Sequence, residues 1–208
     1  MKVSLITVCF RSAGVIRSAI ESVLAQKGVD VDYIVVDGGS NDGTVEILKD
    51  YESKFAGRMR WISERDEGMY DALNKGIKMA KGDVVGILNA DDILEDENTL
   101  AFIASSFEPG VDCVYGDIRF VRGESKKTTR YYSSKRWRPW MHNWGFMPAH
   151  PSVYVRREVF DQVGGYKLGY DISADFEWMV RLLCKARVKA RYLPRSIVTM
   201  RLRGKSTA

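Results

Sequence analysis

Carboxylate side chains recur directly after short apolar runs in the first half of the chain. Asp37 follows one run, Asp66 follows a second, and Asn89, Asp91 and Asp92 follow a third. Adjacent carboxylates repel one another, and a bound cation or a ligand that donates hydrogen bonds offsets that repulsion. Mg²⁺ and Mn²⁺ prefer hard oxygen ligands and are often held by one or two carboxylates together with substrate phosphates. The pattern predicts a ligand or metal site, and capping of a following helix by Asp91 or Asp92 is the alternative.

The segment after Asp37 is rich in glycine but matches neither common phosphate-binding loop. It reads DGGSNDGT, which contains neither GxGxxG nor GxxxxGK[ST]. Residues 40–44 are typical of a turn that leads into a helix cap. Asp37 is different, because a carboxylate at the end of a buried strand can accept a hydrogen bond from a base or a ribose.

Regular elements must place these side chains together. Apolar runs predict strands at residues 3–10, 31–37, 58–64 and 83–89. Helical spacing between them predicts helices at residues 14–26, 42–51 and 70–80. This alternation predicts a parallel α/β sheet, in which ligands bind beyond the carboxyl ends of the strands. The carboxylates all lie at that edge.

The second half has a less regular pattern. We expect strands at residues 113–121 and 127–132, a strand followed by a helix at 151–160, a helix at 173–185, and closing strands at 188–192 and 197–202. These elements favour one mixed domain over residues 1–208, in which a smaller antiparallel portion is joined to a mostly parallel sheet flanked by helices.

Composition narrows the class of protein. The 208 residues have a net charge of +5, a hydrophobic fraction of 45% and a charged fraction of 28%, which excludes a disordered, collagen-like or coiled-coil chain. Residues 1–104 hold 12 Lys and Arg against 18 Asp and Glu, whereas residues 105–208 hold 20 against 9. Three widely spaced cysteines favour a reducing compartment, and no apolar run reaches the roughly 20 residues of a membrane span.

Several segments together resemble a known family. DGGSNDGT and SERDEGMYDALNKGIKMAKGDVVGILNADD are similar to segments of the inverting family 2 glycosyltransferases with the GT-A fold, over residues 3–100. PAHPSVYVRREVFDQVGGY and DISADFEWMVRL resemble the acceptor-side histidine segment and the helix that carries the catalytic base. The resemblance implies a GT-A domain in which residues 1–104 bind a nucleotide sugar and residues 105–208 face the acceptor.

The resemblance also implies roles for residues of the first half. Asp37 would contact the nucleobase, usually uracil, and Asp91 would bind Mg²⁺ or Mn²⁺. Asn89 stands where the family usually has the first Asp of its DxD motif, and Asp92 would support the site. Further residues implied to line the donor site are Thr7, Val8, Asp66, Gly68, Asp71 and Asn74.

The resemblance places the reaction's proton acceptor in the second half. Asp175 matches the catalytic base, although Ala174 replaces the usual neighbouring carboxylate. A base is needed because the acceptor hydroxyl loses its proton as it attacks the anomeric carbon. His150 would lie near the acceptor or the diphosphate, and Arg201, Arg203 and Ser206 resemble a loop that closes over the diphosphate.

Residues 135–146 alternate cations with aromatic side chains in the order KRWRPWMHNWGF. This pattern fits an anionic membrane surface or single-stranded nucleic acid, and a loop that packs its Trp residues inward is the alternative.

The sequence therefore predicts a metal-dependent inverting glycosyltransferase of bacterial polysaccharide biosynthesis. It would move a sugar, most readily from a UDP-sugar, to a glycan or polyprenyl-diphosphate-linked acceptor. We expect a cytoplasmic protein, with a peripheral position on the inner face of the plasma membrane as a further expectation. An inactive nucleotide-sugar-binding module is the alternative, because of Asn89 and Ala174. A basic nucleic-acid-binding protein is disfavoured, since it leaves the carboxylates unexplained, and we expect no nucleic acid partner.

Overall fold

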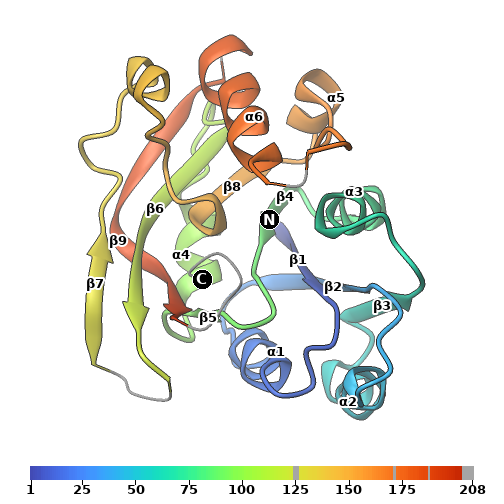
Figure 1. Cartoon of the computed structure of the whole chain (residues 1–208). Coiled ribbons are helices and arrows are strands. Elements are labelled where there is room, and N and C mark those ends of the chain that lie inside the picture. Colours follow the sequence, from blue (N-terminus) through green and yellow to red (C-terminus); the bar gives the residue numbers. More distant parts are fainter. Residues whose placement is uncertain (124–126, 171, 187, 203–208) are drawn as a thin grey trace.

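The computed structural model describes residues 1–123, 127–170, 172–186 and 188–202, and one mixed sheet runs through them (Figure 1). Its strands are β1 (Lys2–Cys9), β2 (Asp30–Asp37), β3 (Met59–Ser63), β4 (Val84–Ile87), β5 (Ile93–Leu94), β6 (Cys113–Val121), β7 (Thr128–Tyr132), β8 (Val153–Arg156) and β9 (Ala190–Arg201). The helices are α1 (Ile16–Leu24), α2 (Thr44–Glu52), α3 (Met69–Met79), α4 (Thr99–Ser105), α5 (Val159–Val163) and α6 (Ala174–Val180). Short helical turns are η1 (Ser53–Phe55), η2 (Pro139–Trp144), η3 (His150–Ser152) and η4 (Arg181–Lys185).

The sheet has a parallel part and a part that contains the antiparallel pairs. Its strand order is β3-β2-β1-β4-β8-β6-β9-β5, and β7 pairs with residues 118–121 of β6, beyond residues 113–115 that pair with β8. β3, β2, β1 and β4 are parallel, whereas β8 runs antiparallel to both β4 and β6. The predicted α/β fold class is confirmed.

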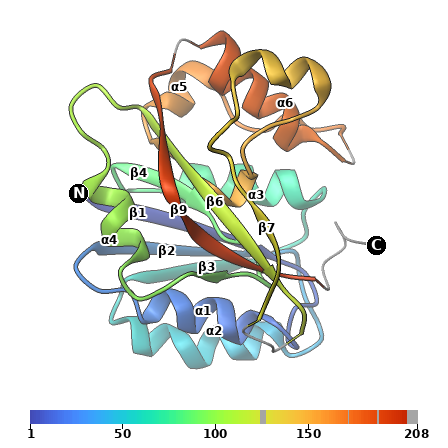
Figure 2. The same ribbon diagram turned by 90° about the vertical axis from the view of Figure 1, so that its left-hand side faces the viewer.

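Helices cover both faces of the parallel part (Figure 2). Alternate residues of β1 point to opposite faces, so Leu5 packs with α1 and α2 while Ile6 packs with α3. Gly86 of β4 lies directly under the ring of Tyr154 in β8, and a Cβ atom there would come 2.1 Å from that ring. These contacts fix the strands whose ends carry the carboxylates.

Some predicted elements of the second half differ from the structure. The two closing strands form the single strand β9, which continues past Pro194 because the β6–β9 register shifts between Tyr115 and Asp117. Pro194 has no backbone N–H to donate, so the sequence around it does not indicate one continuous strand. The predicted helix at residues 173–185 is α6 followed by a turn of π-helix, and the short elements β5 and α4 were not predicted. Within the described residues, no helix combines the length and apolar character needed to span a bilayer.

Candidate functional site

Asp37 ties the carboxyl ends of three parallel strands together. Its fully buried carboxylate accepts hydrogen bonds from the Ser40 backbone N–H at 2.9 Å, the Ser40 hydroxyl at 2.5 Å and the Ser63 hydroxyl at 2.6 Å. The Cys9 thiol lies 3.6 Å away, and burial together with the Asp37 charge raises the pKa of that thiol. A contact between Asp37 and a nucleobase stays a prediction, and it would compete with these internal bonds.

Asp66 and Phe10 lie beside the loop that follows Asp37. Oδ1 of Asp66 accepts a bond from the Gly68 N–H at 2.9 Å, and a Cβ on Gly38 would come 2.7 Å from Asp66 Oδ2 and 3.4 Å from the Phe10 ring. Gly68 has φ +113°, a conformation that favours glycine, and α3 begins at the next residue. Phe10 is 55% exposed at this edge of the sheet, and it is not among the residues predicted for the site. The signal was present as an aromatic residue directly after a buried strand.

Four other residues predicted to bind the sugar donor lie in β1 and α3, and their surroundings differ. Thr7 is fully buried and accepts a hydrogen bond from the Tyr33 hydroxyl, whereas Val8 is partly exposed. Asp71 pairs with Lys75 at 3.3 Å. The Asn74 amide forms two 2.8 Å bonds with the backbone N–H and carbonyl of Tyr166, and so joins α3 to the chain that leads to α6. Contacts of these residues with a donor remain predictions.

Asp91 and Asp92 follow β4 and form the strongest candidate for a cation site. Asp92 is 1% exposed; its Oδ2 accepts a bond from the Asn89 amide at 2.8 Å, and its Oδ1 has no partner in the described part of the chain. Burial, and then the Asp91 charge, raise the pKa of Asp92 to about 7, and burial also raises the pKa of Asp91. The Arg201 cation opposes both shifts, so the end of β9 lies close to this pair.

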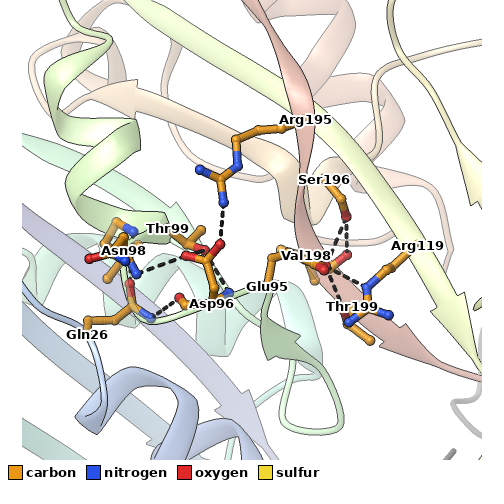
Figure 3. A network of polar contacts seen from close by, with 11 residues as sticks. Gln26, Glu95, Asp96, Asn98, Thr99, Arg119, Arg195, Ser196, Val198 and Thr199 are labelled. Carbon is orange, nitrogen blue, oxygen red and sulfur yellow. Dashed lines mark hydrogen bonds and ion pairs between the residues drawn. The ribbon is translucent and has the colours of Figure 1, made fainter. Parts of the chain in front are cut away.

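A polar network fixes β9 against the segment that follows Asp92 (Figure 3). Oε2 of Glu95 accepts hydrogen bonds from Arg119 Nε at 2.7 Å, from Thr199 Oγ1 at 2.8 Å and from Ser196 Oγ at 3.2 Å. The neighbouring Asp96 pairs with Arg195 at 2.5 Å. β5 also pairs with β9 through Ile93 and Thr199. Together these bonds place Arg201 beside Asp91, whereas Arg203 and Ser206 lie outside the described residues.

The donor set fits a divalent cation that shares its ligands with a substrate. No group of three His, Cys, Asp or Glu side chains in the described ranges is arranged to hold a metal by itself. The unpaired oxygen of Asp92 and the adjacent Asp91 carboxylate supply hard oxygen atoms in a poorly solvated place. Mg²⁺ and Mn²⁺ suit such a site when phosphate oxygens and water complete the coordination. Asp91, with Asp92 beside it, would therefore hold the ion.

Asp175 lies in the first turn of α6 with one oxygen fixed. Oδ1 accepts hydrogen bonds from the Phe176 N–H at 2.8 Å and the Tyr70 hydroxyl at 3.3 Å. Oδ2 forms no hydrogen bond with any described residue, and Asp175 is partly exposed. Ser173, directly before α6, has φ +77°, an uncommon value for a residue with a side chain. The chain thus presents a free carboxylate oxygen.

Glu177, two residues further on, has a different environment. Arg181 donates three bonds of 2.8 to 3.0 Å to it, and Lys167 pairs with it at 2.9 Å. Hydrogen bonds from Arg181 are the main cause that lowers the pKa of Glu177. Arg181 also donates to the carbonyls of Val163 and Gly165, so Glu177 belongs to a structural clamp.

His150 joins a cluster of aromatic rings behind Asp175. Its Nε2 lies 2.7 Å from the Tyr166 hydroxyl, and its ring meets Trp178 edge-on. Tyr166 in turn stacks on Tyr70, whose hydroxyl contacts Asp175. Burial lowers the pKa of His150, which favours a neutral ring at pH 7. The structure therefore brings His150 and Asp175 together through Tyr70 and Tyr166.

A model of the glycosyl transferase family 2 matches residues 4–168. The chain belongs to this family. A protein of Mycobacterium bovis, named as a PGL/p-HBAD biosynthesis glycosyltransferase, is 30% identical over 198 residues, which cover 91% of this chain and 73% of that protein. An uncharacterised glycosyltransferase of Mycobacterium tuberculosis is 30% identical over 196 residues, which cover 88% of this chain and 70% of that protein. The predicted class of enzyme, a glycosyltransferase, is confirmed.

Solved structures support the fold of this family 2 chain. The TarS structure from S. aureus in complex with UDP-GlcNAc has a TM-score of 0.80 at 18% identity and covers all of this chain, which spans 61% of that protein. The mannosyltransferase PcManGT from Pyrobaculum calidifontis, in complex with GDP-Man and Mn²⁺, has a TM-score of 0.73 at 18% identity. The match covers 99% of this chain and 58% of that protein. At such identity the likeness shows a shared fold, and the donor and metal belong to those proteins.

Proposed function

We propose that this chain is a metal-dependent inverting glycosyltransferase that uses a nucleotide diphosphate sugar, with UDP as the favoured nucleotide. The observation that carries the proposal is the buried Asp92, with one unpartnered oxygen in the described part of the chain, next to the partly exposed Asp91 and close to Arg201 at the carboxyl end of β4. A divalent cation would hold a diphosphate next to such a pair, because it would neutralise the negative charge of the carboxylates and of the phosphates. The nucleotide-sugar complexes of the two structural neighbours support a donor of this class.

Asp175 would act as the general base. Its free Oδ2 accepts the proton of the acceptor hydroxyl as that oxygen attacks the anomeric carbon, while Tyr70 and the Phe176 N–H hold Oδ1 in place. A bound Mg²⁺ or Mn²⁺ supplies Lewis-acid stabilisation of the departing diphosphate. The Arg201 guanidinium adds positive charge on the same side. A single displacement inverts the anomeric centre and needs no nucleophile from the protein.

The acceptor that we propose is a hydroxyl of a glycan or of a polyprenyl-diphosphate-linked sugar, in a cytoplasmic protein of bacterial polysaccharide biosynthesis. The mycobacterial relative is named for PGL/p-HBAD biosynthesis, which supports a biosynthetic role. In this scheme residues 1–104 bind the donor and residues 105–208 face the acceptor, with Arg201 as the residue of the second half that reaches the donor side.

Release of nucleotide diphosphate tests the proposal. The purified protein is incubated with a panel of UDP-, GDP- and dTDP-sugars and lipid-extract acceptors, with Mn²⁺, Mg²⁺ or EDTA. We expect turnover with a UDP-sugar that EDTA abolishes and that Asp91→Ala reduces at least a hundredfold. Asp30→Ala is the matched control, since Asp30 lies at the opposite end of the parallel strands and pairs with Lys2. UDP binding without turnover on any acceptor would instead support the inactive binding module that Asn89 and Ala174 raise.

A further inference from the structure

Three large aromatic side chains project into solvent from one short segment of the second half. In residues 135–146, which we call the η2 segment, Trp140 is 64% exposed, Trp144 is 75% exposed and Phe146 is 53% exposed. Single exposed apolar residues are ordinary on protein surfaces, but a group of this size indicates an interaction surface. The described chain offers these rings no intramolecular ring partner.

Buried residues in the same segment hold these rings outward. Trp137 is buried against Tyr115, and its indole N–H donates to the Phe146 carbonyl at 3.2 Å. The buried His142 ring packs against Trp137 and Phe176. The segment thus has a packed inner face, so the exposure of the outer rings follows from its structure.

The same region carries only positive charge. Residues 127–156 contain six Lys and Arg and no Asp or Glu. Within the η2 segment Lys135, Arg136 and Arg138 are exposed, and none of them forms an ion pair with a described residue. Indole rings next to unpaired cations are the combination that lies at the headgroup level of an anionic bilayer.

We propose that the η2 segment binds the surface of an anionic lipid bilayer. Trp140, Trp144 and Phe146 enter the headgroup region, and Lys135 and Arg136 contact lipid phosphates. Two copies of the chain would bring like charges together on this surface, which disfavours self-association through it. Single-stranded nucleic acid could also use cations and rings, and its binding is an outcome that the test below distinguishes.

The position of the segment gives this binding a consequence for the site. The His142 ring lies 5.4 Å from the ring of Phe176, the residue after Asp175, and Cys184 Sγ in η4 lies 3.4 Å from His142 Nδ1. Figures 1 and 2 both show η2 next to α6, at the end of the molecule away from α1 and α2. A bilayer bound here would lie close to α6, the helix that carries Asp175. The inference itself does not depend on the proposed reaction.

Vesicle binding without any sugar donor tests the inference. The protein is co-sedimented with vesicles of phosphatidylcholine alone and of phosphatidylcholine with phosphatidylglycerol. We expect binding to the anionic vesicles, and loss of that binding in Trp140→Ser/Trp144→Ser/Phe146→Ser. Each cation near an anionic surface changes affinity about fivefold, so Lys135→Gln/Arg136→Gln should weaken binding roughly 25-fold. The matched control Lys49→Gln/Lys54→Gln removes two exposed cations on α2 and η1 and should bind as the unmodified chain does.

A second measurement covers the case in which the serine variant fails to fold. Lipids brominated near the headgroup should quench Trp fluorescence of the unmodified chain, and Trp140→Phe/Trp144→Phe should lose most of that quenching while it still binds. Absence of binding to anionic vesicles at low salt would overturn the inference. So would vesicle binding that all variants retain, a change from dimer to monomer in the serine variant, or binding of a single-stranded oligonucleotide in place of vesicles.

Discussion

Replacement of Asp175 by Asn separates its basicity from its structural contacts. The two bonds that fix this side chain go to Oδ1, and an Asn Oδ1 accepts both from Tyr70 and from the Phe176 N–H. The change removes a charge from Oδ2, which makes no hydrogen bond inside the described chain. The free energy of unfolding should therefore change by less than about 1 kcal/mol, since only a partly exposed charge is lost.

The catalytic effect of that change should be much larger. General-base catalysis contributes roughly 10²- to 10⁴-fold, so Asp175→Asn should raise the activation barrier by about 2.7 to 5.4 kcal/mol. The loss should appear in kcat, with the donor dissociation constant within about threefold of the unmodified value, because Asp175 meets the acceptor. Single-turnover release of UDP gives the rate, and calorimetry gives donor affinity.

Glu177→Gln is the control on the same helix. Its carboxylate pairs with Arg181 and Lys167, so its replacement should lower the melting temperature and leave kcat within about threefold. If Asp175→Asn lowers kcat less than tenfold, or if Glu177→Gln lowers it equally, Asp175 is not the base and the assignment from its geometry fails.

Three further predictions concern bonds that support the site. Glu95→Gln should cost about 1 to 3 kcal/mol of stability in thermal melts, since one oxygen accepts three donors, and should weaken Mn²⁺ affinity in calorimetry. Asn74→Ala leaves two backbone groups of Tyr166 unpaired, and should cost about 1 to 3 kcal/mol of stability in thermal melts. Burial opposes ionisation of Asp32, but bonds from Ser4 and Arg60 lower its pKa overall, so its stabilisation is present above pH 4 and is lost as pH falls through its folded pKa. Urea titrations of Asp32→Asn and the unmodified chain should differ at pH 7 and converge near pH 2.

The parallel half of the fold followed from the sequence because its signals are local. Each strand is a short, nearly continuous apolar run, and each helix shows one apolar face, so their ranges agree with β1 to β4 and α1 to α3 within a few residues. The carboxylates at the strand ends could be placed at one edge for the same reason. The single strand β9 could not be predicted from the sequence, because its continuity depends on a register shift against β6.

The contacts of individual site residues were beyond reach of the sequence. Asn74 and Asp71 lie on one helix, yet one bonds the backbone of Tyr166 and the other pairs with Lys75. That difference depends on a chain segment more than 90 residues away. The sequence likewise gave no distinction within the tryptophans of the η2 segment, of which Trp137 is buried and Trp140 and Trp144 are exposed. Tertiary packing decides such choices, so only the residue types were predictable.

The unequal charge of the two halves has a physical explanation in the structure. Asp37, Asp66, Asp91 and Asp92 of the acidic half lie at one edge of the sheet, and burial raises the pKa of Asp91 and Asp92 there. The cation that opposes this shift, Arg201, comes from the end of the basic half, and the bonds of Glu95 to Arg119 and Thr199 hold it in place. One arginine cannot balance the carboxylates of Asp91 and Asp92 together with a diphosphate. If a nucleotide diphosphate binds here, as we propose, a divalent cation would supply the further positive charge.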